Sequence, residues 1–580
     1  MGKKPNKKQE KYYTQKQILS EFDLPKSFLR KSFPPPKLLK RNKQGVRYPL
    51  WTEKQVRQVL NSPAMEKYLR KKEEENAEQK REQEIRDLLE SYSPEYYIAR
   101  AQKLSRIFIL HVGPTNSGKT FDAVEDLKKN TPGTYLGPLR LLALEMTDKI
   151  NAAGIPCSMI TGEEAILQEN AQIVSSTIEL CDFTRHFKTA VIDEAQLIGD
   201  PDRGAAWMKA LCMVDADVVH VCLAPEAAGY ITDLIASFGA EYVIRNHKRL
   251  APLTYAGICR GIRDIRAGDA LICFSRKSVL STAAQLEKKG FKTSVIYGAL
   301  PPQARRDEVR KYMAGESSVV VATDAIGLGI SLPIARIIFA ETSKFDGKQT
   351  RQLNVAEVKQ IAGRAGRYGL NEYGEVLNFG EHSFIGSYLN AQSKTVKACC
   401  IAFPREALHT DYPLEKLLRI WQNLKKSRLF IREDMQDALI LLSTIKKLVR
   451  KNNRELVFDL ITCPVDTSSL ELVGYWTQCA AAIIRDKPIP EPYFGIGSLQ
   501  ACELQYRAWD IHHQLLRRIG REEDNTQERE EICKKIAEFM AENKDQYLRR
   551  CRRCGRVLEI GYTFGLCEHC YETESIYLRT

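Results

Sequence analysis

The chain contains one complete phosphate-binding motif. Residues 113–120 read GPTNSGKT, which matches G-x-x-x-x-G-K-[ST], and they lie between an apolar run at 107–112 and a helix-like segment. The backbone N–H groups of such a loop, and the start of the helix that follows it, attract phosphate. We predict that Lys119 reaches the β- and γ-phosphates of a nucleoside triphosphate and that the Thr120 hydroxyl ligates Mg²⁺. The predicted nucleotide contacts of this loop are Gly113, Pro114, Thr115, Asn116, Ser117, Gly118, Lys119 and Thr120.

A pair of acids follows a second apolar run. Residues 190–196 read AVIDEAQ, a short strand pattern that ends in Asp193 and Glu194. A carboxylate at the end of a strand can hold the Mg²⁺, which we assign to Asp193, and Glu194 can position and deprotonate the attacking water. A strand followed by a solvated acidic turn is the alternative. The phosphate loop and the acid pair together predict phosphoryl transfer to water.

Two glycine-rich segments lie far downstream. Residues 322–330 read ATDAIGLGI and residues 360–367 read QIAGRAGR. Arginines bind the spread charge of a transferring phosphoryl group through their planar forks. We therefore predict that Gln360, Arg364 and Arg367 act on the nucleotide, and that Gly329 contacts it. Two arginines on a solvated helix face are the alternative, which suits a solitary motif better than this pair of segments.

Short β-branched runs alternate with helical stretches between residues 100 and 395. Five runs lie in the first half, at 106–112, 134–136, 173–175, 190–193 and 218–223, and four in the second, at 270–274, 293–297, 319–322 and 337–340. This alternation predicts an α/β fold with two doubly wound parallel sheets and ligands at the carboxyl ends of their strands. After residue 396 the pattern turns helical, with predicted helices at 414–426, 433–451, 469–485, 503–518 and 527–545.

GPTNSGKT, DEAQ, ATDAIGLGI and QIAGRAGR, in this order, resemble the motifs of superfamily 2 DExH helicases. The segment TSKFDG at 342–347 is similar to the mitochondrial degradosome RNA helicase type and its bacterial relatives. The resemblance covers residues 100–420 and implies two tandem RecA-like domains that close on ATP, with the nucleic acid across both. It also implies 3′-to-5′ movement on RNA or DNA.

The same resemblance implies contacts to the backbone of a nucleic-acid strand. These come from Arg140 in PLRLLALE, Thr161 in TGE and Thr177 in SST, and from Arg276 and Thr323 in the second domain. Two features depart from the family. CLAPE at 222–226 replaces the usual Ser-Ala-Thr coupling element, and no glutamine-type adenine-reading motif precedes the phosphate loop. The sequence therefore does not predict how the domains couple or how ATP is selected.

Four of the sixteen cysteines form a metal-binding pattern. Cys551 and Cys554, then Cys567 and Cys570, make two C-x₂-C pairs separated by twelve residues. This spacing predicts a closed tetrahedral thiolate site for structural Zn²⁺, a zinc ribbon. Reduced core cysteines are the alternative for these four and the expectation for the others, which are mostly scattered. The arginines around the pairs suit phosphate contact, and they are Arg549, Arg550, Arg552, Arg553 and Arg556.

Positive charge concentrates in the first fifty residues. The net charge is +14, and residues 1–50 hold fourteen Lys and Arg against three acids. Such a patch is typical of phosphate-backbone binding, and a solubilising tail is the alternative. Two short helical patterns at 14–22 and 24–30, a wing at 45–51 and a capping box at 52–55 resemble a MerR-type winged helix-turn-helix. A simple helical appendage is the rival interpretation.

We divide the chain into six segments. They are a basic N-terminal module (1–65), a charged helical linker (66–99), RecA-like domain 1 (100–247), RecA-like domain 2 (248–395), a helical region (396–545) and the zinc ribbon (546–580). The linker prediction rests on residues 71–90, whose alternating charges at i,i+4 suit an exposed helix.

Composition and the first residues bear on location. The chain is 43% hydrophobic and 28% charged, as in soluble globular proteins, and no apolar run of about 18 residues spans a membrane. The start, MGKKPNKK, lacks the apolar region of a secretory signal, and Glu10, Glu21 and Asp23 count against a transit peptide. We predict a cytoplasmic location in a bacterial setting.

These observations predict an ATP-dependent helicase that acts on RNA. The predicted cofactors are ATP, Mg²⁺ and structural Zn²⁺, and the predicted partners are RNA or DNA and a nuclease or RNA-processing protein, with no membrane. A DNA helicase or duplex translocase of a repair or defence complex is the alternative, favoured by the MerR-like segment. A non-enzymatic scaffold is disfavoured because Lys119, Asp193, Glu194 and Arg367 are all present.

Overall fold

The computed structural model describes most of the chain and divides it into two compact units. Unit 1 comprises residues 1–90 and unit 2 residues 91–580. The described residues are 11–41, 44, 47–162, 164–327, 332–345, 349–366, 373–380, 384–521, 523, 525–542, 544–562 and 564–577. Among them, no helix is both long enough and apolar enough to cross a membrane.

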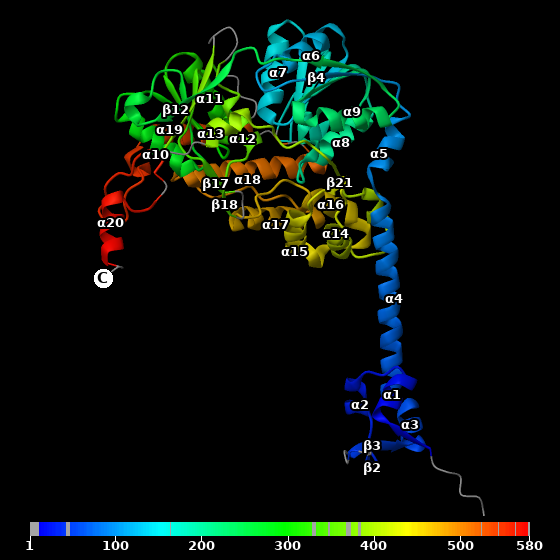
Figure 1. The fold of residues 1–580 in the computed structure, drawn as a ribbon. Helices are drawn as coiled ribbons and strands as arrows, with labels where there is room; N and C mark the ends of the chain where they lie inside the picture. Colours follow the sequence, from blue (N-terminus) through cyan, green and yellow to red (C-terminus); the bar gives the residue numbers. More distant parts are fainter. Residues whose placement is uncertain are drawn as a thin grey trace, which may run out of the picture. The chain divides into compact units, whose positions relative to one another are not determined.

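Unit 1 folds around a three-stranded antiparallel sheet. The strands, in the order β1-β3-β2, are accompanied by three short helices (Figure 1). The core includes Ile18, Leu29 and Trp51, whose indole donates to the carbonyl of Pro34 at 2.8 Å. The two short helices, the wing strand from residue 47 and the capping box at Thr52 are confirmed, whereas strands β1 and β2 were not predicted. Residues 45 and 46 of the predicted wing lie outside the described residues. The elements are β1 (Tyr12–Thr14), α1 (Gln15–Glu21), α2 (Lys26–Ser32), β2 (Leu38–Arg41), β3 (Arg47–Thr52) and α3 (Glu53–Leu60).

A 29-residue helix, α4 (Pro63–Ser91), follows this module. It carries i,i+4 ion pairs such as Arg70–Glu74 and Lys71–Glu75, with all four side chains largely exposed. Exposed pairs of this kind contribute little each. The helix predicted at 71–90 is confirmed within it.

The first α/β domain is built on an eight-stranded sheet in the order β11-β4-β10-β9-β5-β8-β6-β7, parallel except for β7. Its helices are α5 (Pro94–Ala101), α6 (Lys119–Lys129), α7 (Arg140–Ala152), α8 (Gly204–Met213) and α9 (Ala228–Ser237). Its strands are β4 (Ile107–Val112), β5 (Gly133–Gly137), β6 (Cys157–Ile160), β7 (Ala165–Ile166), β8 (Ile173–Thr177), β9 (His186–Ile192), β10 (Asp215–Leu223) and β11 (Glu241–Asn246).

The second α/β domain has a six-stranded parallel sheet in the order β12-β19-β16-β13-β15-β14. Its central strands are buried on both faces, which explains their continuous apolar runs. A two-stranded hairpin, β17 (Ser343–Phe345) and β18 (Thr350–Gln352), precedes α12. The strands are β12 (Leu253–Cys259), β13 (Asp269–Ile272), β14 (Thr293–Ile296), β15 (Val319–Ala322), β16 (Arg336–Phe339) and β19 (Gly374–Phe379). The helices are α10 (Arg276–Glu287), α11 (Pro302–Met313), α12 (Val355–Ala362) and α13 (Phe384–Asn390).

The two predicted parallel sheets are confirmed, and all nine predicted strands are present. The prediction missed β6, β7, β11, β12 and β19. Every residue of β11 is exposed, so this edge strand lacks the buried apolar pattern that marked its neighbours. Strand β12 alternates exposed and half-buried residues up to Cys259, so it also lacks a continuous buried apolar run and was missed.

The remaining residues of unit 2 are mainly helical, and α18 (Leu499–Arg518) contacts both α/β domains. Arg276 of the second domain pairs with Glu503 of α18, and Arg517 of α18 donates to the carbonyl of Thr161 in the first. All five predicted helices are present, and α16 was missed. Helices α14, α15, α17 and α19 are shorter than predicted, whereas α18 begins four residues before the predicted start at 503. The other elements are β20 (Cys399–Ile401), α14 (Leu414–Asn423), β21 (Phe430–Arg432), α15 (Gln436–Ile445), α16 (Arg454–Ile461), α17 (Leu470–Ile484), α19 (Thr526–Ala541) and α20 (Glu568–Tyr577).

Candidate nucleotide site and nucleic-acid interface

The phosphate loop joins β4 to α6 and has the tight backbone that its glycines predict. Asn116 and Gly118 have positive φ values of 61° and 83°, and α6 begins at Lys119. The Lys119 ammonium donates to the carbonyls of Gly113 and Pro114, both at 2.7 Å. The loop therefore turns its lysine and the first N–H groups of α6 toward the same space, which favours phosphate.

The two predicted Mg²⁺ ligands lie next to each other. The Thr120 hydroxyl is 3.2 Å from both carboxylate oxygens of Asp193, at the carboxyl end of β9. Tyr135, which the sequence analysis did not identify, donates its phenol to Asp193 at 2.8 Å. Burial and the neighbouring charge of Glu194 raise the pKa of Asp193 to about 6. A hydroxyl and a carboxylate are the oxygen ligands that Mg²⁺ prefers, so this pair fits that ion.

Glu194 leaves the strand in a left-handed conformation, with φ 52° and ψ 42°. Such backbone strain on a non-glycine residue is typical of functional sites. The Gln196 amide donates to the Glu194 carboxylate, and its oxygen accepts the N–H of Ala224 at 3.1 Å. Ala224 belongs to the CLAPE segment, so a backbone N–H and Gln196 connect that segment to the acid pair without a serine or threonine hydroxyl.

The phosphate loop faces residues of the second domain across a cavity of about 810 Å³. Arg364 lines it together with Glu194 and the loop, and its guanidinium donates to the carbonyl of Gly327 at 3.1 and 2.5 Å. A Cβ at Gly363 would lie 2.7 Å from Thr115, so only glycine permits this approach. The Asn116 amide donates to Gly366 at 2.7 Å. The two domains therefore meet at the predicted nucleotide site.

The other predicted residues of the second domain have different placements. Gln360 lies on α12 beside Gly327. It is not one of the described residues that line the cavity. Arg367 and Gly329 lie outside the described residues. Arg364 therefore lies at the same cavity as the phosphate loop. The roles of Gln360, Arg367 and Gly329 stay predictions.

Arg249 is a residue of this site that the sequence analysis missed. It lies in the segment that joins β11 to β12, and its guanidinium donates to Thr115 and Gly363 at 3.0 Å each, and to Ala365. Burial lowers its pKa to about 10, so it stays charged at neutral pH. One arginine thus binds carbonyls from both walls of the cavity. A single arginine between two strands carries no motif, which is why the sequence did not reveal it.

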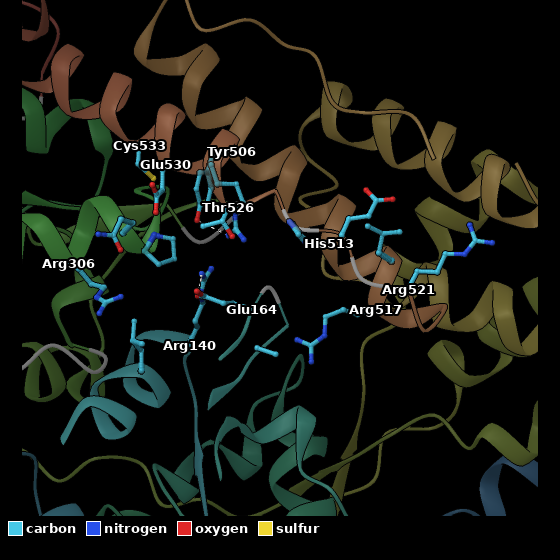
Figure 2. Close-up of a pocket in the computed structure, with 17 residues that line it drawn as sticks. Arg140, Glu164, Arg306, Tyr506, His513, Arg517, Arg521, Thr526, Glu530 and Cys533 are labelled. Atoms are coloured by element: carbon cyan, nitrogen blue, oxygen red, sulfur yellow. Dashed lines mark hydrogen bonds and ion pairs between the residues drawn. The ribbon is translucent and has the colours of Figure 1, made fainter. Parts of the chain in front are cut away.

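A second cavity, of about 360 Å³, lies between both α/β domains and the pair α18 and α19 (Figure 2). Figure 2 shows Arg140 and Glu164 pointing from the first domain toward this helix pair, and the two side chains form an ion pair at 2.8 Å. Five arginines against three glutamates make the lining net basic, and they are Arg140, Arg306, Arg517, Arg521 and Arg529, with Glu164, Glu523 and Glu530. We call this cavity the channel. Arg140 is the only one of the five predicted strand contacts that lines it.

The remaining predicted strand contacts lie elsewhere. Thr161 is fully buried, and its hydroxyl donates to the backbone carbonyl of Glu164 at 3.0 Å, while Arg517 donates to the carbonyl of Thr161. Thr177 ends β8. Arg276 pairs with the buried Glu503, which also accepts the Tyr297 phenol at 2.6 Å. Arg276 therefore docks α18, and its predicted contact to a strand is untested.

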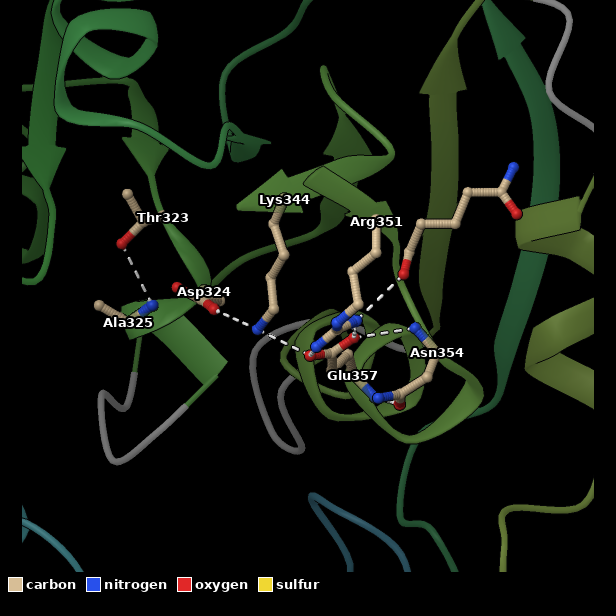
Figure 3. Close-up of polar contacts among 8 residues, drawn as sticks. Thr323, Asp324, Ala325, Lys344, Arg351, Asn354 and Glu357 are labelled. Carbon is tan, nitrogen blue, oxygen red and sulfur yellow. Dashed lines mark hydrogen bonds and ion pairs between the residues drawn. The ribbon is translucent and has the colours of Figure 1, made fainter. Parts of the chain in front are cut away.

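Thr323 sits at the end of β15 beside an ion network that reaches α12 (Figure 3). Its neighbour Asp324 pairs with Lys344 of β17 at 3.1 Å, and Lys344 pairs with Glu357 of α12 at 2.7 Å. Arg351 of β18 also donates to both carboxylate oxygens of Glu357, at 2.8 and 2.9 Å. Burial opposes the charge of Glu357, but these hydrogen bonds outweigh it and lower its pKa to about 2. The hairpin is thus clamped between the Thr323 loop and the helix that leads to Arg364.

The four cysteines of the predicted zinc ribbon converge. Their Sγ atoms lie within 4.8 Å of one another, and those of Cys554 and Cys567 are 3.6 Å apart. Four converging thiols fit a tetrahedral Zn²⁺ shell. Gly561 (φ 79°) lies against the carbonyl of Ala340, so this segment packs on the second domain.

This chain is similar to several known helicases. A family model described as the DEXQ-box helicase domain of Suv3 matches residues 94–247, and one for the helicase conserved C-terminal domain matches 255–369. The mitochondrial DExH-box ATP-dependent RNA helicase DExH16 of Arabidopsis thaliana is 35% identical over 66% of this chain and 69% of its own length. The mitochondrial ATP-dependent RNA helicase SUV3 of Candida albicans is 42% identical over 48% of this chain and 39% of its own. The Escherichia coli helicase HrpB superposes with a TM-score of 0.46 and 17% identity, over 71% of this chain and 58% of that one.

The predicted cytoplasmic location is wrong by this comparison, since the matched relatives are named mitochondrial. The prediction gave three acids among the first fifty residues too much weight. Fourteen basic residues against three acids is a basic, acid-poor composition, which does not argue against organelle targeting.

Proposed function

We propose that this chain, which belongs to the Suv3-type family of superfamily 2 ATP-dependent RNA helicases, uses ATP hydrolysis to move along single-stranded RNA and displace its complement. One observation carries the proposal. The phosphate loop, Glu194 and Arg364 line one cavity that both α/β domains form, with Asp193 beside the loop. ATP hydrolysis at such a site depends on the relative position of the two domains. A helicase uses this dependence to couple ATP hydrolysis to movement along the strand.

The chemistry follows from the residues around this cavity. Lys119 and the α6 N–H groups bind the phosphates, while Thr120 and Asp193 hold Mg²⁺. When bound, that ion neutralises developing phosphate charge. Glu194 takes the proton of the attacking water, and Gln196 fixes the carboxylate for this task. Arg364 leaves the Gly327 carbonyl when the nucleotide binds and meets the charge that spreads over the transferring group.

The channel offers a path for the RNA. Its lining is net basic and comes from both α/β domains and from α18 and α19. Arginine forks bind phosphate oxygens, so Arg306 and Arg521 hold the strand at opposite sides of the channel. A strand held between domains that open and close is moved by their relative motion.

Coupling runs through the ion network of the hairpin. Lys344 joins Asp324, next to the predicted strand contact Thr323, to Glu357 on the helix that precedes Arg364. Strand binding at Thr323 therefore shifts α12 through two ion pairs, and the shift changes the position of Arg364. This supplies a communication route between strand and nucleotide.

Two further parts of the chain, the segment with the four cysteines and the basic N-terminal module, support RNA binding. We assign Zn²⁺ to Cys551, Cys554, Cys567 and Cys570, where it stabilises the fold and leaves no open coordination position. The basic N-terminal module adds salt-sensitive affinity. The relatives are named mitochondrial, which supports a mitochondrial location, and a nuclease or RNA-processing protein remains the proposed partner.

Strand displacement by the full chain tests this function. The substrates are an RNA duplex with a 3′ overhang, the same duplex with a 5′ overhang, and an all-DNA copy of each. We expect ATP-dependent displacement of the 3′-overhang RNA by the parent and none by Glu194→Gln. Faster displacement of the DNA copies would favour a DNA translocase, and no displacement of any RNA would overturn the proposal.

A further inference from the structure

A chain of three histidines lies directly behind the phosphate loop. His111 of β4 is 3.0 Å, nitrogen to nitrogen, from His247 on one side and from His220 on the other. His247 Nδ1 is 3.8 Å from a carboxylate oxygen of Asp122, and His220 Nε2 is 4.0 Å from one of Asp126. The order is therefore Asp122, His247, His111, His220, Asp126, with a carboxylate facing each end. Both acids lie on α6, the helix of the phosphate loop.

The two histidine–histidine contacts, at 3.0 Å, are hydrogen bonds, and each uses one N–H of the three that neutral imidazoles carry. The contacts to Asp122 and Asp126, at 3.8 and 4.0 Å, are longer than a hydrogen bond. The carboxylates therefore face the histidines without being hydrogen-bonded to them.

We propose that His111, His247 and Asp122 bind a divalent transition ion of the Zn²⁺ class, at a site separate from the four cysteines. Their ligand atoms lie within 4.8 Å of one another. Two imidazoles and one carboxylate suit Zn²⁺, whereas Mg²⁺ and Ca²⁺ prefer oxygen ligands alone. On binding, the ion takes the place of the proton between His111 and His247, and that proton leaves to solvent.

The surroundings of the site complete this arrangement. With the ion on His111 Nδ1, the other ring N–H points to His220, and the His220 N–H points toward Asp126. A metal-ligating histidine normally donates its second N–H in this way. Arg245 opposes a cation, but its charge is paired with Asp126 at 3.2 Å. Asp122 is exposed and lines the nucleotide cavity with His247, so an ion can enter from there.

The site would restrain the motor. His247 lies in the segment that joins the two sheets, two residues before Arg249, and Asp122 lies on the phosphate-loop helix. An ion bound to both ties this segment to the loop. Since the two domains must move against each other for turnover, occupancy slows ATP hydrolysis. This consequence rests on the proposed function, whereas ion binding does not.

Zinc binding to the full chain, already loaded at its cysteines, tests the site. The titration uses Zn²⁺ against a chromogenic chelator. We expect one further ion per chain in the parent, and at least about tenfold weaker binding in His247→Gln and in Asp122→Asn. His186→Gln is the matched control, because His186 also pairs with two acids, at 3.0 and 3.3 Å, but is exposed and distant from the cavity along the sheet.

Two results would overturn the site. One is a parent that binds no further ion, and the other is a further ion that His247→Gln and Asp122→Asn retain. Circular dichroism of each variant shows whether it is folded before the titration. ATP turnover is then measured for each protein relative to its own zinc-free rate, and we expect zinc to slow the parent and His186→Gln but not His247→Gln. If zinc binds to the parent but does not slow ATP turnover, the proposed restraint is wrong and the proposed metal site still stands.

Discussion

The nucleotide cavity and the channel are built in opposite ways. The cavity is lined by short motifs that need particular residues at fixed backbone positions, such as Gly363 against Thr115. The channel takes its arginines from four helices, α7, α11, α18 and α19, and from the segment after α18, with no shared motif. Phosphoryl transfer requires defined geometry at one atom, whereas binding a strand requires positive charge and shape. The comparison predicts that substitutions in the cavity change turnover steeply and that substitutions in the channel change affinity gradually.

The largest expected effect is at Glu194. Glu194→Gln keeps the Thr120 and Asp193 pair but removes the base, so ATP turnover should fall about 10²–10⁴-fold while ATP still binds. Steady-state hydrolysis and nucleotide binding measure the two quantities. Glu241→Gln, on the exposed strand β11, is the control and should hydrolyse ATP at the parental rate. Parental turnover in Glu194→Gln would show that the base lies elsewhere.

Arg364 should come next. Because its guanidinium meets the nucleotide only when the domains close, Arg364→Ala should reduce kcat by about 10²–10³-fold and leave KM nearly unchanged. Arg310→Ala removes an exposed arginine of α11 as the control. A variant that loses ATP affinity and keeps its kcat would show that Arg364 binds ATP before the reaction and not the transferring phosphoryl group. The predicted contrast, turnover effects in the cavity and affinity effects in the channel, would then be weaker.

The cysteine cluster should affect stability and leave the chemistry intact. Cys551→Ser should remove one zinc ion per chain and unfold the C-terminal segment, because metal binding and folding are coupled in such sites. Cys181→Ser, outside the cluster, should keep its zinc. Elemental analysis and basal ATP turnover are the measurements. The absence of zinc from parental protein purified without chelators would contradict the assignment.

Substitution of Lys344 should uncouple RNA binding from ATP turnover. Lys344→Met breaks the link between Asp324 and Glu357, so stimulation of ATP turnover by RNA should fall at least about fivefold while the basal rate changes little. Arg351→Met is the matched control, since Arg351 binds the same Glu357 carboxylate from β18. Equal losses in both variants would assign the network to hairpin stability alone.

The smallest effects should be in the channel. Arg306→Ala and Arg521→Ala should each weaken RNA binding and make the slope of log affinity against log salt shallower by about 0.7, the value for one lost phosphate contact on a single strand. Arg419→Ala, which removes an exposed side chain of α14, should leave the slope unchanged. An unchanged slope in both channel variants would mean that the RNA follows another path.

Much of the fold and of the cavity could be predicted because periodicity and motif spacing are local properties. The places of Lys119, Thr120 and Asp193 next to one another could be predicted because the chemistry assigned to each fixes its position in a motif. Arg249 and Tyr135 could not be found, since each acts through contacts with residues remote in sequence. The docking of Arg276 on Glu503, 227 residues away, likewise depends on tertiary structure. The exposed edge strand β11 was missed because it lacks a buried pattern.

The most direct test of the central claim is the rate of ATP hydrolysis by the full chain at saturating ATP, without nucleic acid and with saturating single-stranded RNA. If strand binding at Thr323 repositions Arg364 through the Lys344 ion pairs, RNA raises kcat, and the rise disappears in Lys344→Met. A kcat that is the same with and without RNA would contradict the account, because strand binding and the nucleotide cavity would then act independently.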